Sequence, residues 1–211
     1  MVGLIGKKIG MTQVFTQDNS QIAVTVIQAG PCPILMVRDK NIQLGFDSVK
    51  EKGLKKPQLG LFKKLNIPAR KVIRDIPKEA NIEYKICDEI KVDIFNEGDF
   101  VDISGISIGK GFQGGMKRWH WKGGSRTHGS TSHRRIGSIG SSTTPGRVFK
   151  GHHLPGHMGV GKTTIQNLKV IRVDLENNLL LVKGGVPGYK NGYLVISKSL
   201  KKIGKGTTVK K

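Results

Sequence analysis

The sequence predicts a mainly β protein with some α-helix, in which a β-rich body is interrupted by one long irregular insertion. Two observations carry this prediction. Short runs rich in Val and Ile, bounded by Gly, Pro, Asn and Asp, recur on both sides of the middle of the chain, and such runs are typical of strands. Between them, residues 103–173 contain no Asp or Glu, twelve Lys or Arg, all six His and fifteen of the 29 Gly. A segment of that composition lacks the apolar side chains that a core requires.

The apolar runs define the expected elements in chain order. The run 21–28 alternates only in part, as expected for a strand that is buried on both faces. Helical signal is thin: residues 68–76, with Pro68 near the start, are the best candidate, and 56–65 are a second, shorter one. Glu-Asn-Asn at 176–178 predicts a turn. The expected strands are 2–6, 12–15, 21–28, 33–39, 90–95, 100–107, 163–175, 178–184 and 192–199.

These elements predict a discontinuous body of residues 1–104 and 163–200, an inserted arm of 105–162 and a basic tail of 201–211. A body of that size can bury about two-thirds of its unfolded surface. The arm cannot, because its glycines raise the entropy cost of ordering and its like charges repel one another. We therefore expect the arm to become ordered against a partner.

The charge balance indicates what that partner is. The 211 residues carry a net charge of +21 with a pI of about 10.2, which favours nucleic acid first and an anionic membrane second. No run of 18 apolar residues is present, and the N-terminus has strand character rather than that of a signal peptide. We expect the chain to remain in the compartment where it is made. Cys32 and Cys87 fit free, partly buried thiols in a reducing compartment better than a disulfide.

The predicted arm supplies each kind of side chain that RNA recognition uses. Lys and Arg neutralise phosphates, aromatic rings and imidazoles stack on unpaired bases, and hydroxyl groups reach phosphates and 2′-hydroxyls. For the two tryptophans, packing on the body is the alternative. The candidate RNA-binding residues are Lys110, Lys117, Arg118, Trp119, His120, Trp121, Lys122, Arg126, His128, His133, Arg134, Arg135, Ser138, Ser141, Ser142, Thr143, Arg147, Phe149, Lys150, His152, His153 and Lys162.

Other motifs in the arm are weaker. Residues 109–114 fit GxGxxG, but no acid follows to hold a ribose. Residues 156–163 fit GxxxxGK[ST], yet a β-branched run follows where a phosphate loop requires a helix. His128 with His133, or His153 with His157, has conceivable metal spacing, but no Cys or carboxylate accompanies them. Ser and His without an orienting acid do not support a hydrolase. We therefore expect no cofactor, no metal and no enzyme activity.

Three stretches of the chain resemble one known family. GLIGKKIGMTQVF (3–15), THGSTSHRRIGSIGSSTTPGRVFKG (127–151) and QNLKVIRVDLENNLLLVKGGVPG (166–188) are similar to the bacterial-type large-subunit ribosomal protein three family, collinearly and over nearly the whole chain. The resemblance implies a translation-protein-like β-barrel body and an arm that enters the large-subunit ribosomal RNA. It also implies that the tip, near 137–146, approaches the peptidyl transferase centre.

The resemblance further implies an early role in subunit assembly and contacts with neighbouring ribosomal proteins, in a bacterial cytoplasm or an organelle-encoded plastid setting. This chain departs from the family pattern at two places. Ser141-Ser142-Thr143 replace the glutamine that many members carry after GSIG, and Val160-Gly161-Lys162 replace a polar run. The alternatives are a phosphate-loop nucleotide hydrolase using residues 156–163 and a free nucleic-acid chaperone.

Overall fold

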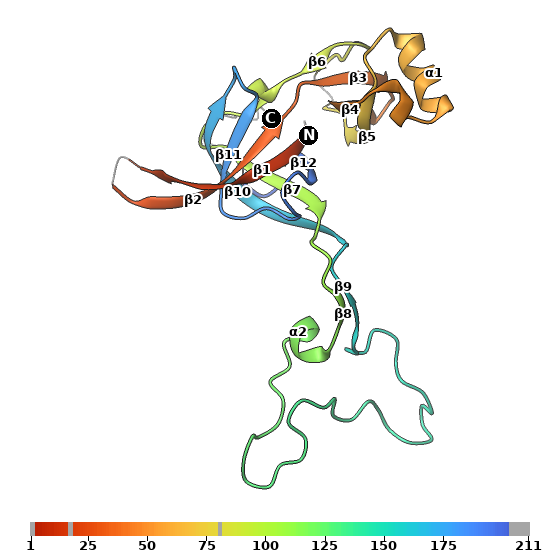
Figure 1. Cartoon of the computed structure of the whole chain (residues 1–211), viewed down its shortest axis with the longest axis vertical. Helices are drawn as coiled ribbons and strands as arrows, with labels where there is room; N and C mark the ends of the chain where they lie inside the picture. Colours follow the sequence, from red (N-terminus) through yellow and green to blue (C-terminus); the bar gives the residue numbers. More distant parts are fainter. Residues whose placement is uncertain (1–2, 17–18, 80–81, 203–211) are drawn as a thin grey trace. The chain divides into compact units, whose positions relative to one another are not determined.

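The computed structural model describes residues 3–16, 19–79 and 82–202. The chain divides into two compact units, Met1–Ser107 with Lys162–Lys211 and Ile108–Gly161, which we call the body unit and the arm unit (Figure 1). Most of the regular structure is strand, so the mainly β prediction is confirmed.

Six antiparallel strands of the body unit close into a barrel. Their order around the barrel is β1 (Gly3–Phe15), β12 (Tyr193–Lys198), β7 (Phe100–Ile106), β10 (Lys162–Asp174), β11 (Leu179–Lys183) and β2 (Gln21–Ala29), which returns to β1. Closure leaves the sheet without exposed edges. It also unites strands from both ends of the chain, because β10, β11 and β12 follow the long insertion (Figure 1).

Alternating side chains fill the barrel. Leu180 and Val182 of β11 and Leu194 and Ile196 of β12 are at most 1% exposed, while the residues between them are less buried. This two-residue period is the one that a strand with one face toward a core requires.

An irregularity in β10 is held by a buried carboxylate. The register against β7 shifts between Ile165 and Leu168, and Asn167 in between has a positive φ of 58°. The backbone N–H of Asn167 donates to Oδ1 of Asp102 at 2.8 Å. Asp102, the last acid before the acid-free window, therefore has a structural partner within the barrel.

A four-stranded antiparallel sheet completes the body unit, in the order β5 (Arg70–Pro77), β4 (Asn41–Ser48), β3 (Cys32–Val37) and β6 (Glu89–Ile90). The helix α1 (Lys56–Leu65) connects β4 to β5 and buries Phe62, and short 3₁₀ turns lie at η1 (Glu51–Gly53) and η2 (Val92–Ile94). The sheet and the barrel share one apolar core, since Ile34, Leu44 and Ile76 pack in the same cluster as the barrel residues.

Two expectations about the body were wrong. Residues 70–77 form β5 rather than the helix predicted for 68–76, because β-branched Val72, Ile73 and Ile76 pair along β4 in register and tertiary pairing outweighs weak helix propensity. Only Ile90 of the expected strand 90–95 is in a strand, and η2 follows. The strand character expected at 3–6 and 12–15 is confirmed, and both runs belong to one strand, β1, with a register shift between Lys8 and Gly10.

Other expectations about the body were confirmed. The short helix at 56–65 and the turn at 176–178 are present. Both thiols are free as expected, but neither is partly buried, since Cys32 is buried and Cys87 is exposed. Burial raises the pKa of the Cys32 thiol to about 12. The largely buried strand β4 has no clear strand signal in the sequence, because Asn, Gln, Gly and Asp interrupt its apolar residues. Of the predicted tail 201–211, residues 203–211 lie outside the described part of the chain.

Candidate nucleic-acid interface

The arm unit has almost no buried side chain. Within residues 108–161, all of which the structure describes, only Gly115 is buried. The unit contains nine Lys or Arg, six His, fourteen Gly and no acid. The ion pairs found among the described residues, Lys7–Asp47, Arg38–Asp75 and Arg70–Glu89, all lie in the body unit. The charge of the arm unit is therefore not compensated by carboxylates of its own.

A short ladder and a short helix give the arm unit its regular structure. The strands β8 (Gly111–Gln113) and β9 (Gly156–Met158) pair antiparallel. The helix α2 (Gly115–Trp119) starts directly after β8, and His120 ends it with a positive φ of 60°. The remainder follows an irregular path (Figure 1).

Contacts between α2 and residues 153–154 hold the base of this irregular path. Nη1 of Arg118 and Nε1 of Trp119 both donate to the carbonyl oxygen of Leu154, at 2.7 and 2.9 Å. The His153 ring stacks on the Trp119 ring with 4.0 Å between centroids and an 8° interplanar angle. The Arg118 guanidinium lies over the same indole at 4.9 Å. Trp119 thus packs against residues of its own unit.

Glycines allow further close approaches. A Cβ on Gly115 would lie 2.0 Å from the Trp121 ring, and one on Gly124 would lie 2.3 Å from the carbonyl oxygen of Ser132. Gly123 has a positive φ of 78°, and a Cβ there would lie 2.4 Å from the carbonyl oxygen of His133. Only glycine fits at such contacts. The backbone N–H of Gly124 also donates to His133 O at 3.1 Å.

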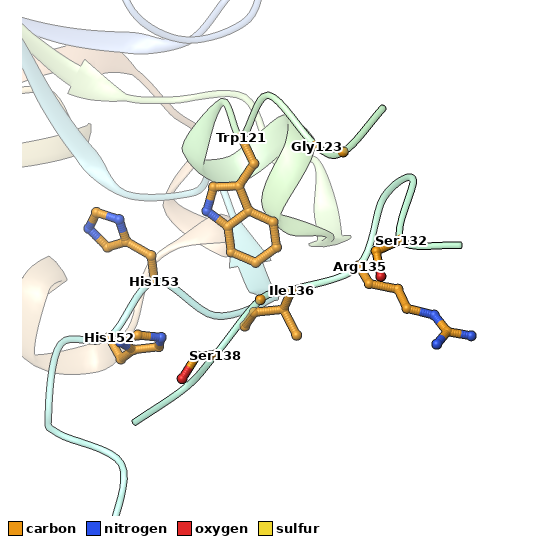
Figure 2. A pocket seen from close by; sticks show the side chains of 10 residues that line it. Trp121, Gly123, Ser132, Arg135, Ile136, Ser138, His152 and His153 are labelled. Carbon is orange, nitrogen blue, oxygen red and sulfur yellow. The ribbon is translucent and has the colours of Figure 1, made fainter. Parts of the chain in front are cut away.

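An open pocket of about 470 Å³ lies beside these contacts within the arm unit. Three stretches of chain line it: the turn after α2, the segment 132–138 and the histidines at 152–153. In Figure 2 the Trp121 indole points toward Ile136, with both histidines on one side and the Arg135 side chain extending away on the other. The lining contains no carboxylate.

The predicted RNA-binding residues lie in several parts of the structure. Trp121, Arg135, Ser138, His152 and His153 line the pocket, while Lys117, Arg118 and Trp119 belong to α2. Lys162 is the first residue of β10 and belongs to the body unit. The predicted residues that lie in the arm unit outside the pocket and α2 are Lys110, His120, Lys122, Arg126, His128, His133, Arg134, Ser141, Ser142, Thr143, Arg147, Phe149 and Lys150, and all of them are exposed.

Sequence reasoning did not select several pocket residues. Ile136, Gly123, Gly124 and Ser132 line the pocket, but an isolated Ile and two glycines carry no chemical signal. The signal that could have identified Ile136 and Ser132 is their location inside the segment 127–151, which resembles the known family.

The nucleotide motif at 156–163 lacks the structure that phosphate binding requires. Residues 156–158 form β9, Val160 has a positive φ of 55°, and Lys162 begins the strand β10. A phosphate loop needs a helix N-terminus at that position. In the part of the chain that is described, no three His, Cys, Asp or Glu gather where they could hold a metal. Nor does any helix there have the length and apolarity to cross a membrane.

Comparison with known proteins connects this architecture to one family. The family described as ribosomal protein L3 matches residues 76–176. A protein from Brachyspira pilosicoli is 49% identical over 211 residues, covering 97% of each chain. One from Acetivibrio thermocellus is 49% identical over 205 residues, covering 94% of this chain and 97% of its own. Both relatives are named large ribosomal subunit protein uL3.

By these relatives, the chain with its barrel body and acid-free arm unit is a ribosomal protein. Proteins of this family are structural proteins and not enzymes. Within that class, the chain belongs to the ribosomal protein L3 family.

Proposed function

We propose that the chain binds large-subunit ribosomal RNA, with the arm unit as the principal contact surface. The observation that carries the proposal is the arm unit itself: residues 108–161 have nine Lys or Arg, no acid and one buried residue. A folded unit without a core gains little from its own packing. A polyanion would supply both the missing contacts and the missing negative charge.

The predicted residues contribute to RNA binding in different ways that depend on their side chains. Exposed Lys and Arg neutralise phosphates, with Arg as the better bidentate donor. Rings such as Phe149, which is 62% exposed, offer faces to unpaired bases. Glycines let the backbone approach the nucleic acid closely.

The family supports a finer role. We infer that the body unit docks at the surface of the large subunit and contacts neighbouring ribosomal proteins, and that the chain joins early in assembly in the cytoplasm. The segment 137–146 is then the tip that approaches the peptidyl transferase centre. Its exposure is consistent with this role, since every residue in it except Pro145 is exposed.

The dependence of binding on salt tests the proposal. We expect the logarithm of the affinity for large-subunit ribosomal RNA to fall by roughly 0.7–0.9 per log unit of salt for each phosphate neutralised. Arg134→Ala with Arg135→Ala removes two arm charges, so the slope should decrease by about 1–2 in a filter-binding titration. Lys63→Ala with Lys64→Ala, which removes two charges from α1, is the matched control. Binding that hardly varies with salt would contradict the proposal.

The two other candidate functions have less support. A nucleotide hydrolase would need a helix after residue 162, and β10 is a strand there. A free nucleic-acid chaperone would share the phosphate contacts but would not sediment with ribosomal subunits. The names of the relatives favour the ribosome over the chaperone.

A further inference from the structure

We propose that the pocket beside Trp121 receives one unpaired nucleobase of the bound RNA, which stacks on the indole. This inference rests on the proposed function, because it needs RNA as the partner, and it assigns a single-base site within the broad contact surface. The pocket is a hollow in a unit that otherwise exposes most of its side chains.

The position of the Trp121 ring is the first argument. The ring lies against Gly115 so closely that a Cβ there would be 2.0 Å away, and it lines the pocket. The indole is therefore supported by backbone and held in one place without a surrounding core. A platform that is ordered before binding loses little entropy when a base stacks on it.

The contrast with Trp119 is the second argument. Trp119 already stacks with His153 at 4.0 Å and has the Arg118 guanidinium over its ring at 4.9 Å. Its Nε1–H is satisfied by Leu154 O at 2.9 Å. Trp119 therefore braces the wall that carries His153, and Trp121 remains as the indole of the pocket.

The lining is the third argument. A volume of about 470 Å³ falls in the range of roughly 300–1,000 Å³ that is usual for small-molecule sites. The hydroxyl of Ser138 and the imidazoles of His152 and His153 can donate to or accept from base edges. The absence of any carboxylate disfavours a cationic ligand. Arg135 extends outward from the rim (Figure 2), where the phosphate next to a bound base would lie.

The ligand is a base of a polymer rather than a free nucleotide. The arm unit has no phosphate loop to hold an isolated phosphate, since the motif at 156–163 leads into a strand and the helix α2 has only five residues. Its cations are instead distributed along the whole unit, as binding to a chain of phosphates requires. Bases in duplex RNA are already stacked, so only an unpaired base can enter.

Fluorine NMR on the full chain labelled with 5-fluorotryptophan tests the proposal, because the chain has only two tryptophans. The probes are a single-stranded oligoribonucleotide and an abasic strand of the same length, which has the phosphates without the bases. Trp119→Phe and Trp121→Phe serve to assign the two resonances. We expect the Trp121 resonance to shift on adding the base-containing strand but not the abasic strand, and the Trp119 resonance to shift less.

Affinity provides an independent measurement. Trp121→Ala should weaken binding of the base-containing strand by about 5- to 150-fold and leave binding of the abasic strand unchanged, while Trp121→Phe should retain most of the affinity. The proposal is overturned if both strands bind but shift the Trp121 resonance equally, or if both bind and neither shifts it. If neither strand binds at all, the proposed RNA-binding function itself fails.

Discussion

Gly115 has a larger structural role than its size suggests. Apolar side chains hold the body together by packing, and in the arm unit close contacts at glycines serve the same purpose. These contacts let backbone and rings approach to distances that a Cβ would forbid. Gly115 against Trp121 is the tightest of these contacts, and neighbouring Gly114 has nothing within 4 Å of an added Cβ. The two adjacent glycines therefore form a natural comparison.

We predict that Gly115→Ala displaces the Trp121 ring, whereas Gly114→Ala does not. The added methyl group would meet a rigid indole at 2.0 Å, so the ring must move. The expected result is a changed Trp121 resonance in the labelled free protein and weaker binding of single-stranded RNA for Gly115→Ala alone. Equal spectra for the two variants would show that this contact does not position the ring.

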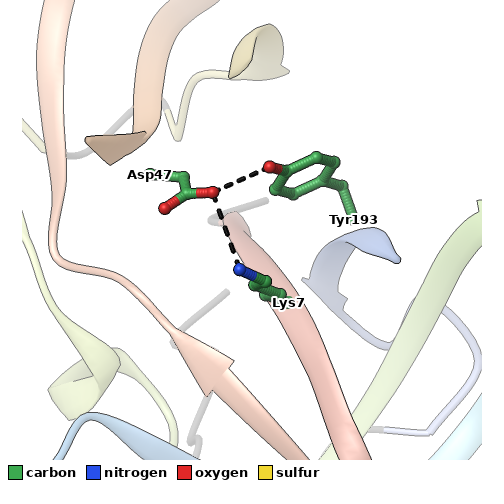
Figure 3. Close-up of polar contacts among 3 residues, drawn as sticks. All are labelled: Lys7, Asp47 and Tyr193. Carbon is green, nitrogen blue, oxygen red and sulfur yellow. Dashed lines mark hydrogen bonds and ion pairs between the residues drawn. The ribbon is translucent and has the colours of Figure 1, made fainter. Parts of the chain in front are cut away.

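Among the elements of the body unit, a cluster of polar side chains joins the barrel to the four-stranded sheet. The hydroxyl of Tyr193 in β12 donates to Oδ2 of Asp47 in β4 at 2.7 Å, and Nζ of Lys7 in β1 lies 3.7 Å from the same oxygen (Figure 3). Phe46 meets the Tyr193 ring edge-on at 6.4 Å. Burial, and then the bond to Asp47, raises the pKa of Tyr193.

We predict that Tyr193→Phe lowers the free energy of unfolding by about 1.5–3 kcal/mol, the usual contribution of a hydrogen bond to a charged group. Exposed Tyr189→Phe is the control. The folded pKa is raised above the ordinary value of 10.0, so this stabilisation is complete below pH 10 and is lost as pH rises through the folded pKa. Urea unfolding at pH 7 and above pH 10 measures both effects. An equal loss for the two variants would contradict the role of the contact.

For the whole chain, the arm unit should be separable from the fold of the body. Ile106 and Lys162 are cross-strand partners at the ends of β7 and β10, so a short Gly-Ser linker can replace residues 108–161 and close a hairpin between them. The apolar core lies entirely in strands and turns that this replacement leaves intact.

We predict that the replacement variant folds cooperatively but no longer accumulates in large ribosomal subunits. Thermal unfolding followed by circular dichroism measures the first property, and sedimentation of a lysate measures the second. The unchanged chain is the control and should co-sediment with large subunits. A variant that fails to fold would refute the separation, and an unchanged chain found mostly free would favour the chaperone alternative.

Features that depend on neighbouring residues could be predicted from the sequence, whereas features that depend on residues far apart in the chain could not. The helix at Lys56–Leu65 and the turn before β11 follow from neighbouring residues, and both were predicted. The strand β5 was predicted as a helix, because its partner β4 is supplied by a segment that has no strand signal of its own. In the arm, composition indicated the kinds of residue that are proposed to contact RNA. It could not identify which tryptophan is already packed, since that depends on His153 and Leu154 more than thirty positions away.

By itself, the sequence determined the mainly β class, the basic insertion and, through three matching stretches, the family. These properties are carried by composition and by short patterns of adjacent residues. Only the tertiary structure decided which strands close the barrel, that Trp119 is braced by His153, and that Trp121 faces a pocket with residues 132–138. Those features depend on pairs of residues brought together across long loops, and local sequence does not specify such pairs.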